Sequence, residues 1–377
     1  MFSAESYFTT QPPPPSLTQD VVGVKEFISR QAAAGRNVVL VTSGGTTVPL
    51  ELNVVRFLDN FSAGTRGATS AEYFLKAGYA VIFMHRQFSL QPFSRHYSHS
   101  TNPFLDFLAV EDDTACIVSD RRADALLLSV LSAYKSVQQA GTLHTMTFVT
   151  VNDYLWLLRA VSQEMSVLGK RAMYYLAAAV SDFFLPRQKM SEHKIQSGKG
   201  SLHIEMDQVP KILKPMVEEW TRDGYIVSFK ARSLETDDHL LIPKARAALN
   251  RYGHQVVIGN ELHTRKYQVV FVERKKKPLP PLPPGVVEDA VAPEAAPIPP
   301  TESKESATLN EATATEPPPP LPPSPPPKPV LIEEDESMTF VESWLRIPED
   351  AANAGQEIEA DIVEELVRRH EAWIENV

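Results

Sequence analysis

Short apolar runs rich in Val and Ile alternate with longer amphipathic stretches from Val21 to about Arg274. There are seven such runs: NVVLVTS (37–43), AVIFMHR (80–86), HTMTFVTV (144–151), AMYYLAAAV (172–180), YIVSFK (225–230), QVVIGN (255–260) and YQVVFVE (267–273). Strands that are apolar throughout are typical of parallel sheets buried on both faces, and amphipathic stretches between them are typical of the covering helices. The pattern predicts an α/β fold, a three-layer sandwich with a mostly parallel central sheet, which binds ligands at the carboxyl ends of its strands.

The distribution of proline divides the chain into parts. Residues 278–330 hold 19 of its 31 prolines among Ala, Glu, Ser and Thr, and such a segment cannot offset its ordering entropy by burial. We therefore expect a flexible N-terminal leader (1–20), an α/β domain (21–277), a Pro-rich disordered insertion (278–336) and the C-terminal part of the same domain (337–377). The PLPPLPP and PPPPLPPSPPP runs fit ligands of SH3 or WW domains, although a tolerated surface insertion is the simpler interpretation.

The formal net charge is −10, but residues 331–377 carry 14 acidic and 3 basic residues, which leaves the preceding part of the chain near neutral. This balance argues against a general nucleic-acid binder. The single cysteine, Cys116, excludes an intramolecular disulfide and a Cys-based zinc cluster. Because the sequence has no secretory signal pattern and no run of about 18 apolar residues, we expect a cytoplasmic protein, with the nucleus as a second compartment, and no membrane partner.

Two Gly-rich clusters stand at predicted strand and helix ends. Thr42–Thr47 follows the first predicted strand, and its paired glycines let the backbone approach a ligand closely; a simple tight turn is the alternative. Asn60–Gly67 opens a predicted helix, where unpaired amides face an anion; a Ser-capped helix start is the alternative. Neither cluster contains GxxxxGK[ST] or GxGxxG, so the sequence lacks a Walker-type motif and disfavours a dinucleotide site.

Longer stretches around these clusters resemble one enzyme family. They are TSGGT (42–46), VPLE (48–51), VRFLDNFSAGTRGATSAEYFLKAGY (55–79), YYLAAAVSDFFLP (174–186), HKIQSG (193–198), VPKIL (209–213), RAALNRYGHQVVIGN (246–260) and EIEADIVEELVRRH (357–370). Together, and in this order, they resemble the phosphopantothenoylcysteine synthetases, also called phosphopantothenate–cysteine ligases, of the eukaryotic type.

The resemblance implies a Rossmann-like fold, a homodimer and a ligase that couples ATP cleavage to amide formation between 4'-phosphopantothenate and L-cysteine, in coenzyme A biosynthesis. In this family the carboxylate attacks the α-phosphate, pyrophosphate leaves, and cysteine captures the acyl-adenylate with release of AMP. ATP is then a co-substrate. Mg²⁺ is expected to arrive with its phosphates, since no His, Cys or paired-carboxylate pattern in the sequence has metal-ligand spacing.

The resemblance also assigns site residues. The nucleotide-binding positions are Gly44, Ser62, Gly64, Gly67, Phe229 and Asn260, and the substrate-binding positions are Ala178, Ala179 and Asp182. Asn60 matches the catalytic asparagine, whose amide can hydrogen-bond both the acyl-phosphate and the amine; local backbone capping is the alternative. Lys194 matches the lysine of a flexible lid and would stabilise charge on the α-phosphate and the leaving pyrophosphate; a solvated loop is the alternative.

Two features depart from the family. Ala231, Arg232 and Ser233 separate the motifs SFK (228–230) and LETD (234–237), which are continuous in the family. We expect the three residues to bulge out beside Phe229 without changing its register. Gly259 stands where alanine is usual, with no expected effect. Two other functions stay open at this point: a nicotinamide-dependent oxidoreductase, which the missing GxGxxG pattern disfavours, and a scaffold that recruits SH3 or WW domains.

Overall fold

The structure is a computed structural model of the 377-residue chain. It describes residues 2–53, 55–97, 108–111, 115–118, 121–193, 200–232, 241–276 and 338–375. Contacts group Met1–Lys275 with Met338–Val377 into one compact unit. The predicted Pro-rich insertion, 278–336, lies outside the described residues.

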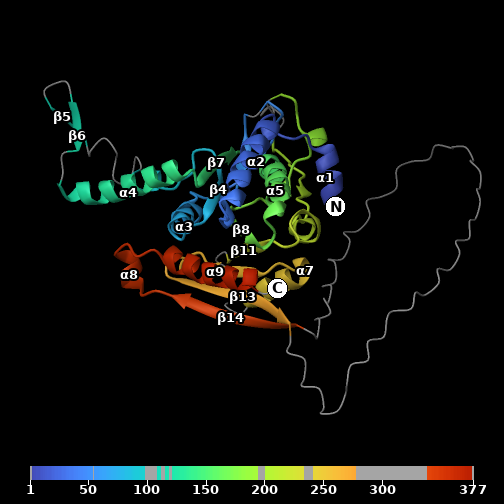
Figure 1. Cartoon of the computed structure of the whole chain (residues 1–377). Helices are drawn as coiled ribbons and strands as arrows, with labels where there is room; N and C mark the ends of the chain where they lie inside the picture. The colour runs from blue at the N-terminus through green and yellow to red at the C-terminus, as the bar shows by residue number, and fades with distance from the viewer. Residues whose placement is uncertain are drawn as a thin grey trace, which may run out of the picture. The chain divides into compact units, whose positions relative to one another are not determined.

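An eight-stranded sheet forms the centre of this unit (Figure 1). Its order is β14 (Met338–Arg346), β13 (Gln268–Lys276), β12 (Val256–Glu261), β11 (Tyr225–Arg232), β8 (Ala172–Leu176), β1 (Val38–Ser43), β4 (Ala80–Arg86) and β7 (Leu143–Phe148). The six strands from β12 to β7 are parallel, and β13 runs antiparallel to β12. All seven predicted strands are present, which confirms the predicted mostly parallel sheet.

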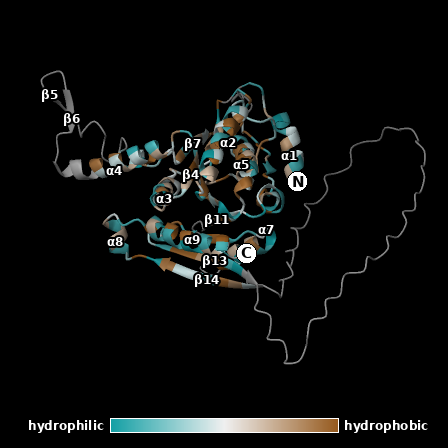
Figure 2. Cartoon of the chain, in the orientation of Figure 1, coloured by the Kyte–Doolittle hydropathy of each residue, from teal (hydrophilic) through white to brown (hydrophobic). Residues whose placement is uncertain are grey.

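Helices cover both faces of the sheet, because alternate strand residues point to opposite sides. Val38 and Leu40 of β1 pack with α1 (Ala4–Thr10), α2 (Leu17–Ala33) and α5 (Val151–Met165). Val39 and Val41 pack with α3 (Thr65–Lys76) and α9 (Ile358–Glu375), while α7 (Leu241–Tyr252) packs on β12 and β13. Hydrophilic and hydrophobic residues mix on α2, α5 and α9 in Figure 2, as expected for helices with one face on a core.

The remaining elements lie outside the eight-stranded sheet. They are the hairpins β2 (Thr47–Pro49) with β3 (Phe57–Asp59), β5 (Leu108–Glu111) with β6 (Ala115–Val118), and β9 (Phe183–Phe184) with β10 (Asp207–Gln208); the helices α4 (Arg121–Ala140), α6 (Leu213–Pro215) and α8 (Glu349–Asn353); and the short turns η1 (Ser94–His96), η3 (Ser166–Arg171), η4 (Arg187–Lys189) and η6 (Met216–Trp220). Within the described residues, no helix has both the length and the apolar character to cross a membrane.

The N-terminal residues differ from the flexible leader that the sequence predicts. Residues Ala4–Thr10 form α1, in which Tyr7 is fully buried and Phe8 is 8% exposed. Ser3 caps the helix, since its hydroxyl accepts a hydrogen bond from the Ser6 N–H at 3.1 Å. This part of the chain is ordered because its aromatic side chains enter the same core as α2 and α5.

The end of β11 also corrects an expectation. Instead of bulging out, Ala231 and Arg232 continue the strand in register with Asn260 and Glu261 of β12. The longer ladder gives the backbone N–H and C=O groups of these residues hydrogen-bond partners, whereas a bulge would leave these groups to solvent. Ser233 lies outside the described residues.

Helix α9 is fixed to the sheet through a buried histidine. His370 Nε2 lies 2.8 Å from the Lys170 carbonyl, so this nitrogen carries the proton. Its Nδ1 then accepts from the Tyr79 hydroxyl at 2.7 Å. Burial lowers the pKa of His370 to about 4, so the imidazole stays neutral near pH 7.

Candidate active site

The topology of the sheet places two loops side by side. Strand β1 pairs with β4 on one side and with β8 on the other, so the chain order reverses between β1 and β8. Ligands of open α/β sheets bind at such a switch point, outside the carboxyl ends of the strands. Gly44 follows β1 and Ala178 lies two residues beyond β8, so both predicted site segments leave the sheet here.

Main-chain hydrogen bonds join these two loops to each other. The Ala179 N–H donates to the Gly44 carbonyl at 2.8 Å, and the Thr46 N–H donates to the Ala179 carbonyl at 3.0 Å. The Asn60 N–H in turn donates to the Thr46 carbonyl at 3.0 Å. The structure therefore brings together a predicted nucleotide residue, a predicted substrate residue and the predicted catalytic asparagine.

A second loop, ahead of α3, lies against the end of β1. The Ser43 hydroxyl donates to the Gly64 carbonyl at 3.0 Å, and the Gly64 N–H donates to the Ser62 hydroxyl at 3.3 Å. Gly64 has a φ of +82° and caps α3, whose first amides and positive dipole end suit an anion. A Cβ on Gly67, in the first turn, would lie 2.4 Å from Ser43 Oγ, so this close approach requires glycine.

Two residues of this region were missed by the sequence reasoning. A Cβ on Gly44 would lie 2.7 Å from Arg86 Cβ, and a Cβ on Gly64 would lie 3.4 Å from Ser89 Cβ. Ser89 Oγ is 3.3 Å from His85 Nδ1, which also hydrogen-bonds the Arg86 carbonyl at 2.9 Å. Arg86 ends β4 and Ser89 follows it, and their segment has no glycine cluster to mark it in the sequence.

Phe229 and Asn260 lie further along the same edge of the sheet. The Phe229 ring packs edge-on against Tyr175 at 4.9 Å between ring centres, and the Arg66 guanidinium lies 5.8 Å from the Phe229 ring centre. Asn260, near the end of β12, is 8% exposed and pairs with Ala231. Arg66 links Phe229 to the start of α3, so it is a further residue that sequence reasoning missed.

The predicted substrate residues lie after β8. The Ala178 N–H donates to Thr42 Oγ1 at 3.2 Å, which fixes the first of them beside β1. Asp182 is exposed, and its carbonyl accepts from the Val209 N–H at 2.9 Å. Asn60 is exposed as well, at the end of the β2–β3 hairpin. Lys194, the predicted lid lysine, lies outside the described residues.

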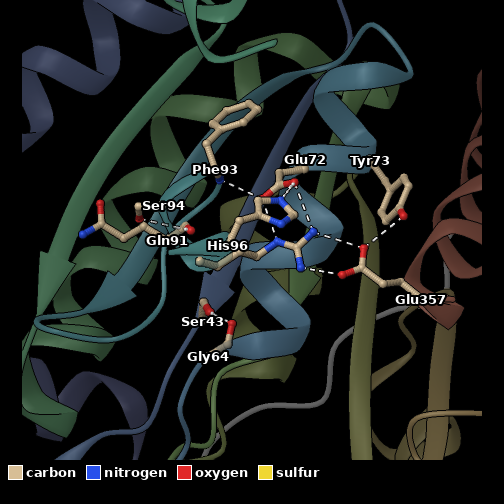
Figure 3. A network of polar contacts seen from close by, with 10 residues as sticks. Ser43, Gly64, Glu72, Tyr73, Gln91, Phe93, Ser94, His96 and Glu357 are labelled. Carbon is tan, nitrogen blue, oxygen red and sulfur yellow. Dashed lines mark hydrogen bonds and ion pairs between the residues drawn. The ribbon is translucent and has the colours of Figure 1, made fainter. Parts of the chain in front are cut away.

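A polar network holds the segment after β4 onto α3 and onto the chain ahead of α9 (Figure 3). The Arg95 guanidinium binds the carboxylates of both Glu72 and Glu357, and His96 Nε2 lies 3.0 Å from Glu72. Burial alone would raise the pKa of Glu72, but the bonds to His96 and Arg95 and the positive charge of Arg95 lower it overall. Tyr73 donates to Glu357 at 3.0 Å, so the network connects α3 to the C-terminal part of the chain.

Comparison with known proteins assigns this arrangement to a family. A family model described as "DNA/pantothenate metabolism flavoprotein C-terminal domain" matches residues 123–277. The chain is 45% identical to phosphopantothenate–cysteine ligase CAB2 of Saccharomyces cerevisiae over 294 residues. This match covers 72% of this chain and 78% of that protein. The chain belongs to the phosphopantothenate–cysteine ligase family. The human phosphopantothenate–cysteine ligase is also 45% identical, over 267 residues that cover 70% of this chain and 84% of that protein.

A solved structure agrees with the family assignment. A histidine-to-alanine variant of Cab2 in complex with phosphopantothenate-cysteine is 37% identical, with a TM-score of 0.72 and 98% of each chain covered. The resemblance stated from the sequence is thereby confirmed, and the chain is an enzyme of this ligase family.

One departure from the family has a structural consequence. A Cβ on Gly259, where alanine is usual, would lie 2.8 Å from Val270 Cγ1 and 3.1 Å from Leu241 Cγ. Glycine at this position of β12 therefore lets α7 and β13 pack close to the strand.

Proposed function

We propose that the enzyme joins phosphopantothenate to cysteine at the expense of ATP, through an acyl-adenylate, as a step of coenzyme A biosynthesis. The observation that carries this proposal is the set of hydrogen bonds that joins Gly44, Ala179 and Thr46 at the switch point, next to the Gly64 end of α3. It supports a site where a triphosphate and a carboxylate lie side by side, as adenylation requires.

The reaction then has two steps. The phosphopantothenate carboxylate attacks the α-phosphorus of ATP, a P–O bond forms, and pyrophosphate leaves. The cysteine amine attacks the acyl carbon, an amide forms, and AMP leaves while the amine loses a proton. Backbone amides at Gly44 and Gly67 would hold the phosphates, with Gly64 and Ser62 beside them, and Mg²⁺ would accompany the triphosphate as part of the substrate.

The remaining site residues take the roles that the family resemblance assigns to them. Phe229 and Asn260 would contact the base and ribose, because they lie in the carboxyl-terminal halves of β11 and β12, toward the edge of the sheet where the glycine loops leave it. Ala178 and Ala179 would line the pantothenate arm, and Asp182 would accept hydrogen bonds from the amide or hydroxyl groups of that arm. Asn60 would hydrogen-bond the acyl-phosphate and the incoming amine, and Lys194 would offset charge on the phosphates.

We further propose that the ligase is a cytoplasmic homodimer. The β2–β3 hairpin exposes several large apolar side chains: Val55 (54% exposed), Phe57 (50%), Leu58 (43%) and the adjacent Phe61 (82%). Several large apolar side chains exposed on one short hairpin are typical of an interface. Sedimentation velocity of the wild type and of Phe57→Asp tests this; a monomeric wild type contradicts it.

Pyrophosphate release tests the reaction most directly. ATP, CTP, GTP and UTP are each supplied with and without phosphopantothenate and cysteine. Release should require phosphopantothenate but not cysteine, and ATP should exceed CTP in kcat/KM by at least about tenfold, or roughly 1.4 kcal/mol. Equal or better use of CTP would overturn the choice of ATP, and release without phosphopantothenate would overturn the acyl-adenylate.

A further inference from the structure

The N-terminal segment, residues 2–13, contacts the chain that leaves the substrate loop. Tyr7 packs edge-on against Phe184 at 4.9 Å between ring centres, and Phe2 packs on the same ring at 5.4 Å. Phe184 belongs to β9 and is two residues beyond Asp182. The segment is anchored on its other side by α5, since Phe8 packs on Trp156 at 4.9 Å.

Gln11 forms the polar centre of this contact. It is 5% exposed, and its Oε1 accepts from the Arg187 N–H at 3.1 Å. Its Nε2 donates to Gln188 Oε1 at 3.4 Å, and Gln188 Nε2 donates back to the Thr10 carbonyl at 3.2 Å. The Gln11 carbonyl accepts from Trp156 Nε1 at 3.1 Å. The buried side-chain amide thus joins the N-terminal segment to the turn η4, and the backbone carbonyl of the same residue joins it to α5.

The chain held in this way is attached to the active site at both of its ends. At the start, the Ser181 N–H donates to Thr46 Oγ1 at 3.0 Å, next to the joined loops. Further along, the Leu52 N–H donates to the Ser191 carbonyl at 2.9 Å, beyond β2. The stretch from Ser181 to Ser191 therefore spans the substrate side of the site, and residues in its middle touch the N-terminal segment.

We propose that Gln11 is a positioning residue, through which the N-terminal segment sets the place of residues 181–193 and hence of Asp182. The inference rests on the proposed function, because Asp182 is taken there as a substrate-binding residue. Among the hydrogen bonds between described residues, none that holds Gly44, Gly64 or Gly67 involves residues 2–13. Loss of the Gln11 amide should therefore weaken the binding of phosphopantothenate and leave the binding of the nucleotide unchanged.

Gln31 offers a matched control for this residue. It is also a buried glutamine, 2% exposed, and hydrogen bonds engage both ends of its amide: Nε2 donates to the Gly141 carbonyl at 2.9 Å, and Oε1 accepts from Arg36 at 3.1 Å. It lies on α2, away from residues 181–193. Gln11→Met and Gln31→Met keep the length of the side chain and remove its hydrogen bonds, so the two variants should lose similar stability.

The experiment compares KM for phosphopantothenate, KM for ATP and amide hydrogen exchange of residues 181–193 in both variants. Gln11→Met should raise KM for phosphopantothenate about tenfold, the effect of roughly 1.4 kcal/mol, with KM for ATP within about twofold of the wild type. Gln188→Ala, at an exposed residue, should shift KM the same way by a smaller factor.

Exchange of residues 181–193 should become faster in Gln11→Met and not in Gln31→Met. Equal exchange in the two variants, or an equal change in both KM values, overturns the proposal. Hydrogen exchange does not depend on the reaction. Faster exchange confined to Gln11→Met, in a protein whose wild type forms no phosphopantothenoylcysteine, would retain the positioning role and reject the proposed function.

Discussion

Arg86 and Asp59 form an ion pair, with 2.6 Å between Nη1 and Oδ1, that joins the end of β4 to the end of β3. Asp59 directly precedes Asn60, and the base of the Arg86 side chain lies against Gly44. The two side chains are 19% and 32% exposed, and pairs near the surface contribute only about 0–1 kcal/mol to folding. We therefore expect the pair to act chiefly on the position of the hairpin end, next to Asn60.

Asp59→Asn removes the charge and keeps the shape of the side chain. Turnover of the complete reaction should fall by about three- to tenfold, because Asn60 loses a fixed neighbour and small misplacements are costly for catalysis. The free energy of unfolding should change by less than about 1 kcal/mol. Glu218→Gln, which breaks an exposed pair with Lys214, is the control. Wild-type turnover in Asp59→Asn would show that the pair does not position Asn60.

Gly67→Ala should weaken nucleotide binding. Its Cβ would lie 2.4 Å from Ser43 Oγ and 2.5 Å from Ser43 Cβ, so either β1 or α3 must move. Overpacking of this kind costs about 1–3 kcal/mol of stability, and we expect the Kd for ATP, measured by calorimetry, to rise at least about tenfold. The control is Gly23→Ala on α2, whose Cβ would meet only the His144 ring at 3.2 Å. Equal Kd values in the two variants would contradict a close approach at Gly67.

The two predicted catalytic residues should divide the reaction between them. Lys194→Gln should abolish pyrophosphate release even without cysteine, because the leaving phosphates lose their cation. Asn60→Asp should slow transfer to cysteine more than adenylate formation, because a carboxylate cannot donate to the acyl-phosphate. Single-turnover measurements of pyrophosphate and product separate the two steps. Wild-type rates in either variant remove that residue from the mechanism.

The free energy of unfolding should decrease as the pH falls from about 6.5 toward 4, because His370 stays neutral there in the folded protein and is protonated in the unfolded chain. The unfolded chain binds a proton near pH 6.5, whereas the folded chain binds it only near pH 4. Between pH 6.5 and 5 this difference amounts to about 2 kcal/mol of unfolding free energy. Burial lowers the pKa of His254 to about 4 as well, so it adds a loss in the same range.

His370→Gln isolates the contribution of one histidine. Glutamine can still donate toward the Lys170 carbonyl but does not titrate, so urea denaturation at pH 7 and pH 5 should show a smaller loss of stability than in the wild type. The same loss in both proteins would mean that His370 is protonated in the folded state.

Residues 278–336 should be dispensable for catalysis. Strands β13 and β14 are neighbours in the sheet, and the Ile347 N–H donates to the Tyr267 carbonyl at 3.0 Å, so a hairpin connection can close across their other ends. A short Gly/Ser linker should leave kcat/KM within about threefold, because loop-closure entropy changes slowly with length. An insoluble or inactive product would show that the segment contributes to the fold.

The sheet was predictable because its strands are buried on both faces and thus read as continuous apolar runs. The N-terminal helix was not, since Ala4–Thr10 is too short to show a helical period and precedes four prolines. The residues on which this helix packs, Trp156 and Phe184, are roughly 150 and 180 residues away in the sequence. A local sequence pattern cannot predict a contact over such a separation.

The glycines of the site were predictable from their clusters, whereas their neighbours were not. Ser89 and Arg86 reach the glycine loops only because β4 pairs with β1, a tertiary relationship that the sequence does not mark. The end of β11 shows the opposite error: extra residues suggested a bulge, but backbone pairing with β12 extended the strand through Arg232.

The hydrogen bonds between Gly44, Ala179 and Thr46 set the spacing of the two loops through the backbone itself. A site fixed in this way is preorganised, so an occupant does not have to immobilise the loops that receive it. The conformational entropy lost on binding then falls on the ligand and on nearby side chains, where it is smaller. Side-chain substitutions around the loops should therefore change how long a ligand stays more than how fast it arrives.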